Sequence, residues 1–252
     1  MAVQIVVASI PQTTVVIDDC SLRWLVGDVD PADCLIAYTP KGADSLADSY
    51  DNNAAPDNGM ADGTYDIASA GDEPDFTTAN GWDFNGTSDR LATANNITEL
   101  NSISDFSVIA RCVTHTLAGG DSGLRYIAST EGNSAGTTPF ILRLNTGDDK
   151  VYGYIGGAGW REAHYDNAIL ADTSYVVAMK YDGSNITVYR DGIAQTPNPE
   201  VGNSGTQNRL SVGYCLPYGG RYWDGYIYAV AVHKPGLTTA QIVLMTMAMN
   251  AL

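Results

Sequence analysis

The residues near the carboxyl end constrain the fold more than any other part of the chain. From Trp223 to His233 almost every residue is aromatic, β-branched or alanine, which is typical of a strand buried on both faces. Pro235-Gly236 must end this strand, because proline has no backbone N–H and glycine accepts unusual backbone angles. Thr238 or Thr239 can then begin a short helix. The apolar residues of this helix are Ile242, Val243, Leu244, Met247 and Leu252.

The composition limits the kinds of partner. The chain has 252 residues, with 13 lysines and arginines against 29 aspartates and glutamates, for a formal net charge of -16. We expect no nucleic-acid partner, because phosphate contacts need a basic face. No run approaches the roughly 18–20 apolar residues of a membrane helix, so we expect no membrane insertion. The 26 glycines and 15 tyrosines are typical of many short strands joined by turns.

Residues 1–33 differ in pattern from the rest. They hold three β-prone runs separated by Pro11 and by acidic residues, and no basic segment precedes them, so we expect no signal peptide. The segment can supply extra strands to the main domain, or it can be an arm that docks on another subunit by strand addition. We interpret it as an N-terminal arm or anchoring segment, followed by one domain over residues 34–252.

Turn signals divide that domain. Gly81 to Thr93 predicts a hairpin with a type I′ turn at Asn85-Gly86, and with Trp82 and Phe84 on one face. Lys41 to Thr78 is a long loop rich in Asp, Asn, Gly, Ala and Pro, of a length that is often functional.

The remaining strands follow at short spacing. Asp182-Gly183 and Asp191-Gly192 predict two further reversals. Other expected strands are Leu35–Tyr38, Phe106–Val113, Leu124–Ser129, Phe140–Leu144, Val151–Ile155 and Leu210–Tyr214. About a dozen short strands without repeated βα units predict a two-sheet sandwich.

Four segments, in this order, resemble a known family: residues 81–91, 106–113, 175–194 and 224–242. They resemble the laminin-G-like, concanavalin A-like jelly roll, versions of which occur in phage structural proteins and bacterial surface proteins. The resemblance covers roughly residues 34–250. It implies an all-β jelly-roll sandwich of two antiparallel sheets, one of them concave, with a short C-terminal helix.

Cysteines and acidic loops raise the question of crosslinks and metals. Cys20, Cys34, Cys112 and Cys215 follow no metal-binding spacing, and a bridge between Cys20 and Cys34 stays open. We expect no required cofactor. The resemblance implies that calcium can bind at the sheet rim, and the candidate ligands are Asp121, Asp148, Asp149 and Asp166. The alternative is that these are solvated turn carboxylates.

Aromatic residues beside polar ones mark two candidate carbohydrate sites, because rings stack on sugar faces while polar groups bind hydroxyls. The first comprises Trp160, Arg161, His164 and Tyr165, and the second Tyr218 and Arg221. A glycosidase needs two carboxylates across a cleft. The glutamates are isolated in apparent loops or turns: Glu73, Glu99, Glu131, Glu162 and Glu200. We therefore expect no enzyme.

The sequence thus predicts a non-enzymatic virion protein, a phage capsid decoration or fibre-type protein that displays a glycan-binding-type sandwich. Its arm would bind other virion proteins of the capsid or tail. It would lie on the virion surface after assembly in the host cytoplasm, as a homo-oligomer, with a trimer suggested by the resemblance. The alternative is a bacterial carbohydrate-binding lectin or adhesin domain, extracellular or at the cell surface. A glycan hydrolase or lyase is the third reading.

Overall fold

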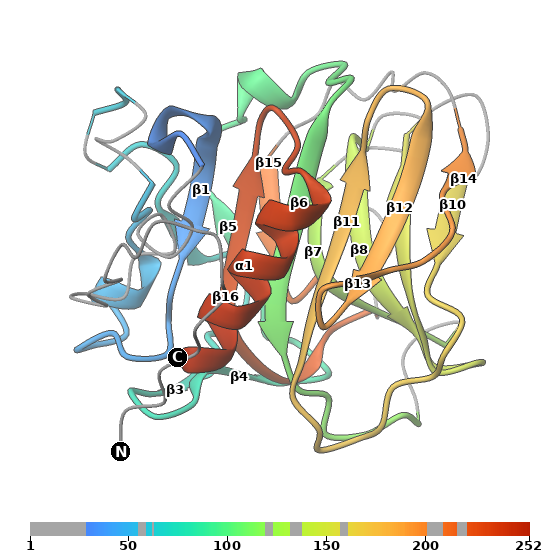
Figure 1. The fold of residues 1–252 in the computed structure, drawn as a ribbon. Coiled ribbons are helices and arrows are strands. Elements are labelled where there is room, and N and C mark those ends of the chain that lie inside the picture. Colours follow the sequence, from blue (N-terminus) through green and yellow to red (C-terminus); the bar gives the residue numbers. More distant parts are fainter. Residues whose placement is uncertain are drawn as a thin grey trace.

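The computed structural model describes residues 29–54, 59–61, 63–118, 123–131, 138–156, 161–200, 209–215 and 221–252. In this part of the chain, two antiparallel sheets pack face to face and one α-helix lies outside them (Figure 1). The predicted sandwich is confirmed. The interpretation of residues 1–28, and with it any bridge from Cys20, lies outside the described residues.

Sheet A contains nine of the described strands, with β16 (Asp224–His233) inside it. In spatial order it runs β13 (Ile193–Ala194), β12 (Asn185–Arg190), β11 (Tyr175–Tyr181), β6 (Phe106–Cys112), β16, β4 (Gly81–Asn85) and β3 (Asp75–Thr77). In addition, β1 (Cys34–Tyr38) pairs with β16, and β14 (Asn198–Pro199) pairs with β12. The turns at Asp182-Gly183 and Asp191-Gly192 are confirmed, since each joins paired neighbours.

Sheet B contains seven of the described strands. In spatial order they are β10 (Arg161–His164), β9 (Lys150–Ile155), β8 (Phe140–Asn145), β7 (Leu124–Glu131), β15 (Arg209–Val212), β5 (Leu91–Thr93) and β2 (Ile67–Ser69). Short 3₁₀ turns lie outside both sheets, at Pro31–Asp33, Asp48–Tyr50 and Thr98–Leu100. The predicted long loop therefore contains β2, β3 and one of these turns.

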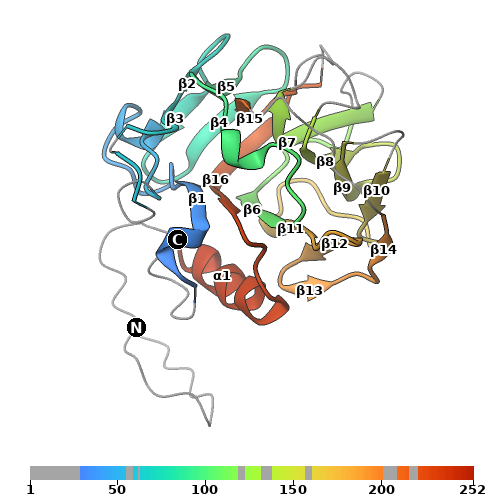
Figure 2. The same cartoon turned by 90° about the horizontal axis from the view of Figure 1, so that it is seen from above.

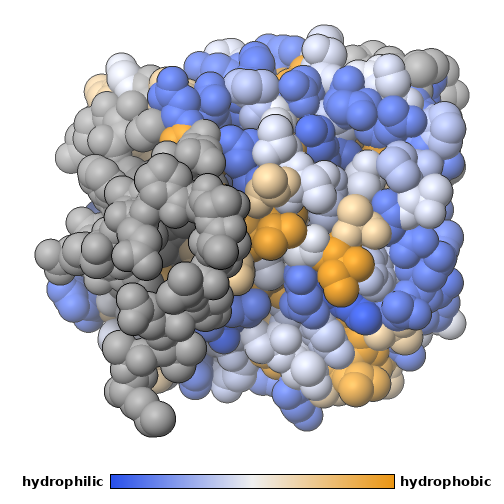
Figure 3. Space-filling model, in the orientation of Figure 1, coloured by the Kyte–Doolittle hydropathy of each residue, from blue (hydrophilic) through white to orange (hydrophobic). Residues whose placement is uncertain are grey.

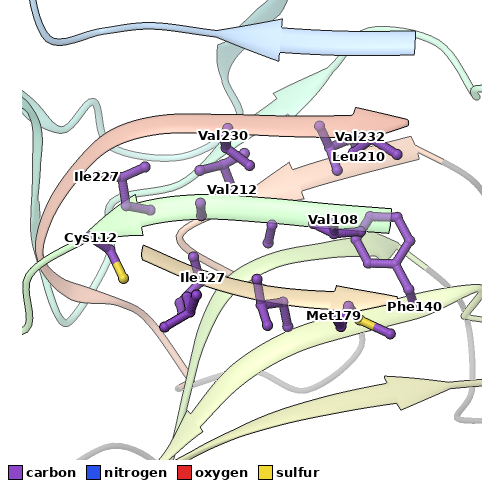
Figure 4. Packing of buried hydrophobic residues seen from close by; sticks show 14 of the residues in the cluster. Val108, Cys112, Ile127, Phe140, Met179, Leu210, Val212, Ile227, Val230 and Val232 are labelled. Atoms are coloured by element: carbon purple, nitrogen blue, oxygen red, sulfur yellow. The ribbon is translucent and has the colours of Figure 1, made fainter. Parts of the chain in front are cut away.

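The main core lies between the two sheets. Alternate residues of β6 point into it, namely Phe106, Val108, Ala110 and Cys112, as their period-2 spacing predicts. From sheet B, Phe140 lies against Val108 and Met179 (Figure 4), and its ring centroid is 5.6 Å from that of Phe106. Because this core fills the space between the sheets, the other face of each sheet is its outer face.

A second apolar layer lies between sheet A and helix α1 (Thr239–Ala251), which lies on the side of sheet A away from sheet B (Figure 2). In β16, Val230 and Val232 face the main core, while Ala229 and Ala231 face the helix. Small residues on this side let the helix approach closely. The predicted burial on both faces is confirmed for this half of the strand.

Thr238 caps α1. Its hydroxyl accepts a hydrogen bond from the backbone N–H of Gln241, and the Gln241 side chain accepts one from the backbone N–H of Thr238. This reciprocal capping box satisfies two N–H groups that the first turn leaves unpaired. The predicted helix and its start are therefore confirmed.

The apolar residues of α1 are not all buried. Val243 and Met247 are 38% and 49% exposed, whereas Met245 and Met249 are buried against sheet A. The helix is apolar nearly all round, so its period does not fix which stripe faces the sheet. Figure 3 shows the surface around α1, where small apolar patches are separated by polar residues. In the described part of the chain, no helix is long and apolar enough to span a membrane.

The predicted hairpin at residues 81–93 is wrong. β4 belongs to sheet A and β5 to sheet B, so the connection crosses from one sheet to the other. The Asn85 carboxamide oxygen accepts hydrogen bonds from the N–H groups of Thr87 and Ser88, and its NH₂ group donates to Asp89 at 2.6 Å. Asn85 therefore organises a side-chain turn of the Asx kind, which redirects the chain instead of reversing it.

Candidate functional site

Basic and aromatic side chains alternate in a row across the outer face of sheet B. Tyr126 of β7 pairs with Arg143 of β8, which pairs with Tyr152 of β9. Tyr152 pairs in turn with His164 of β10. Directly paired residues point to the same side of a sheet. Arg221 extends this line, since its guanidinium lies 5.8 Å from the centroid of the Tyr126 ring. We call these five residues the Arg–aromatic row.

The alternation along β9 shows that the row faces away from the core. Val151 and Ile155 belong to the core between the sheets. A Cβ atom on Gly153 would lie 2.9 Å from Met179 of sheet A, so glycine is needed where β9 packs against sheet A. Tyr152, between these inward positions, therefore points outward.

Contacts along the row hold each side chain in place. Arg221 Nη1 donates a hydrogen bond to Tyr126 Oη at 2.7 Å. The Arg143 guanidinium lies 5.5 Å from the centroid of Tyr152, within the range of cation–π attraction. The rings of Tyr152 and His164 are 5.0 Å apart. The side chain of Arg143 is only 6% exposed and that of His164 is 40% exposed, so the row opens toward β10.

Two carboxylates support the row from its sides. Arg143 Nη2 donates to Glu162 Oε2 at 2.6 Å, and Tyr152 Oη donates to Asp148 Oδ2 at 2.7 Å. Burial, and then the hydrogen bond to Asp148, raise the pKa of Tyr152, so its phenol remains a neutral donor. The prediction that Glu162 lies in a loop is wrong, because it occupies β10 on the same face as His164.

The first predicted carbohydrate cluster is divided by the sheet. His164 lies in the row. Arg161 is next to Glu162 in β10, and adjacent residues of a strand point to opposite sides of the sheet, so Arg161 points away from the row. Tyr165 is buried in the core between the sheets, with the Arg190 guanidinium 4.7 Å from its ring centroid. It does not line the row.

Of the second cluster, Arg221 lies in the row, while Tyr218, like Trp160, lies outside the described residues. Sequence reasoning missed Tyr126, Arg143 and Tyr152. One signal was available, because Arg143 stands inside the otherwise apolar strand Phe140–Leu144. A charged residue in such a strand has to face a polar partner or solvent.

The three predicted calcium ligands that the structure describes are not gathered into one site. Asp148 and Asp149 lie in the turn between β8 and β9, and Asp166 follows β10. The Asp166 carboxylate accepts a hydrogen bond from Gln195 and lies 3.3 Å from His164 Nε2. Among the described residues, no three His, Cys, Asp or Glu side chains are placed to hold a metal ion. Because Asp121 lies outside them, calcium binding stays a prediction.

Comparison with known proteins shows the family to which the chain belongs. Residues 85–243 match a laminin G family described as the concanavalin A-like lectin/glucanases superfamily, and the chain belongs to this family. The same superfamily name covers both lectins and glucanases, so membership fixes the fold and leaves the activity open. No curated protein sequence matches the chain.

Solved structures share this fold at low sequence identity. The chain resembles Trypanosoma rangeli sialidase in complex with sialic acid, at a TM-score of 0.61 and 12% identity, over 87% of this chain and 33% of the sialidase. It also resembles the receptor-binding domain of botulinum neurotoxin D, at 0.58 and 9%, over 87% and 53%. Domain 4 of the extracellular arabinanase AbnA from Geobacillus stearothermophilus, in complex with arabinotriose, matches at 0.57 and 13%, over 85% and 98%. The chain spans a third of the sialidase and half of the toxin domain.

Proposed function

We propose that the chain is a non-enzymatic module that binds glycans along the Arg–aromatic row. The register of β7 to β10, which sets Tyr126, Arg143, Tyr152 and His164 side by side, is the observation that carries this proposal. Aromatic rings stack on the apolar faces of sugars, while guanidinium groups and carboxylates bind hydroxyls in fixed directions. Tyr126, Arg143 and Tyr152 are buried, so the proposed ligand is an oligosaccharide whose terminal unit contacts the exposed end of the row.

The exposure of the side chains along the row indicates where a glycan approaches it. The side chains of Glu162 and His164 are 36% and 40% exposed, and both lie on β10, the edge strand of sheet B. The other end of the row, at Tyr126, is buried. A glycan therefore approaches at β10, with His164 and Glu162 as its first contacts.

Two pairings favour recognition over hydrolysis. A glycosidase of this fold would use two carboxylates flanking the scissile bond, one as the acid and one as the base or nucleophile. Here Glu162 is held by Arg143 at 2.6 Å and Asp148 by the Tyr152 hydroxyl at 2.7 Å. We assign both carboxylates the task of positioning the row.

The test is an array of oligosaccharides probed with the full chain and with two variants. His164→Ala removes the exposed end of the row and should abolish binding. Lys180→Ala is the control, because Lys180 is a half-buried basic residue of β11 in sheet A and lies outside the Arg–aromatic row. Binding that survives His164→Ala, or no binding to any glycan, contradicts the proposal. Release of reducing sugar from a bound polysaccharide would contradict its non-enzymatic part.

We further propose that the module is displayed on a surface, as part of a virion or, alternatively, of a bacterial cell. The β-prone pattern of residues 1–33 supports an arm that anchors it. Val29 packs in the apolar layer under α1, so a deletion should stop at residue 28. Light scattering should then show an oligomer, a trimer by our expectation, for the full chain and a folded monomer after deletion. The same number of chains per particle before and after the deletion would refute the role of the arm in assembly.

A further inference from the structure

A hollow lies on the outer face of sheet A, on the opposite side of the molecule from the Arg–aromatic row. Its volume is about 280 Å³. It is lined by Asp75, Phe76, Thr77, Asn80, Asp83 and Tyr226. We call this the Tyr226 hollow. Its size lies just below the range of pockets for drug-sized ligands, so it suits one small ring.

The aromatic wall of the hollow is held rigid. The ring of His115 meets that of Tyr226 edge to face, with centroids 4.7 Å apart. Tyr228 stacks beside Tyr226 at 5.9 Å, and Lys41 and Arg111 each lie about 5 Å from the centroid of Tyr228. A ring fixed in this way loses little freedom when a ligand stacks on it.

The polar wall of the hollow, formed by Asp75 and Asp83, lowers the stability of the fold. Asp75 of β3 and Asp83 of β4 are directly paired across the two strands, and like charges in that position destabilise a sheet. His115 Nε2 lies 2.9 Å from Asp83 Oδ1 and offsets part of this repulsion. Tyr226 also experiences the negative potential, since the charge of Asp83 raises its pKa.

The chemistry of these walls selects the ligand. Ionised carboxylates only accept hydrogen bonds, so the ligand has to donate them. Asn80 can both donate and accept through its side-chain amide. An acidic ligand would be repelled by Asp75 and Asp83, whereas a sugar offers several hydroxyl donors around a ring with an apolar face.

We propose that the Tyr226 hollow binds a single uncharged sugar unit. One face of the sugar packs on Tyr226, and its hydroxyls donate to Asp75 and Asp83. The inference is independent of the function proposed for the Arg–aromatic row, because it uses another sheet and other residues. Together the two sites would make the sandwich bivalent.

The test uses the full chain labelled for NMR and a panel of neutral methyl hexopyranosides and methyl arabinosides. At least one should shift the backbone amides of Asn80 and Tyr226, with a dissociation constant of about 1 mM. Asp75→Asn should weaken this sugar about tenfold and, by removing the like-charge pair, raise the urea midpoint. Asp44→Asn is the matched control, since it removes the same charge from an exposed position outside the hollow.

His164→Ala separates this proposal from the previous one. It should leave the shifts at Asn80 and Tyr226 unchanged, whatever it does to oligosaccharide binding on the array. No shift at these amides with any neutral sugar overturns the hollow as a binding site. Equal binding of methyl glucuronide, which carries a carboxylate, overturns the argument from charge, as does unchanged affinity in Asp75→Asn.

Discussion

His233 ends β16 in an environment that a charged imidazole cannot tolerate. The residue is fully buried, and among the described residues neither ring nitrogen has a hydrogen-bond partner. Burial lowers the pKa of His233 from 6.5 to about 4. The folded chain therefore holds a neutral ring over a range of pH in which the unfolded chain is already protonated.

The sign and size of the effect follow from this difference. Because the unfolded state binds the proton first, stability is fully present above pH 6.5 and falls as the pH drops toward 4. A gap of about 2.5 pKa units, at about 1.4 kcal/mol per unit, gives a loss of about 3 kcal/mol from this one side chain. Most of that loss is reached by about pH 4.5.

His233→Leu tests the reasoning. Leucine removes the titrating group and both unpaired nitrogens, so the variant should be at least as stable as the parent near pH 7 and should lose about 2–3 kcal/mol less on going to pH 4.5. Urea unfolding followed by the fluorescence of the four tryptophans measures both values. His164→Leu, at a side chain that is 40% exposed, should keep the acid loss. If His233→Leu and the parent lose the same free energy, the buried neutral histidine is refuted.

Four further substitutions test the fold by the same urea assay. Thr238→Ala removes the cap of α1 and should cost about 1 kcal/mol; an unchanged midpoint would argue against the capping box. Asn85→Ala should cost about 1–2 kcal/mol, because it removes the side-chain turn between the sheets; a neutral result would contradict that role. Gly225→Ala would place Cβ 2.1 Å from Val113 O and should cost about 3 kcal/mol or more, whereas Gly59→Ala, also at positive φ but with nothing within 4 Å, should cost about 1 kcal/mol. Equal costs for the two glycines would refute the clash.

Local sequence signals predicted much of the sandwich because they report on local physics. The alternation of Phe106, Val108, Ala110 and Cys112 placed a strand and its inward face correctly. The pairs Asp182-Gly183 and Asp191-Gly192 supply the positive φ angles that tight reversals need, and they joined the expected strands.

The predicted hairpin at Asn85-Gly86 is wrong, although the chain does turn at these residues. Gly86 does adopt a positive φ of 73°, and Trp82, Phe84 and Leu91 are all buried in one core. However, a core between two sheets accepts apolar side chains from both sides. The same pattern therefore fits two strands that pair with each other and two strands that face each other across the core.

The candidate site was harder to predict because it depends on register between strands. Nothing local relates Tyr126 to Arg143, or Tyr152 to His164, until β7 to β10 are aligned. The sequence argument looked for aromatic residues near each other in the chain. It therefore grouped His164 with Tyr165, which packs inside the core, and it placed Arg221 in a separate cluster with Tyr218.

The place of β16 in sheet A has a consequence for biosynthesis. This strand pairs with β1, β4 and β6, yet it follows all three in the sequence. While the chain is being made, these earlier strands have no partner in the positions that β16 will occupy, and exposed strand edges invite pairing with other chains. Sheet A can therefore close only after His233 has left the ribosome, and until then the edges of β1, β4 and β6 that β16 will cover are open to other chains.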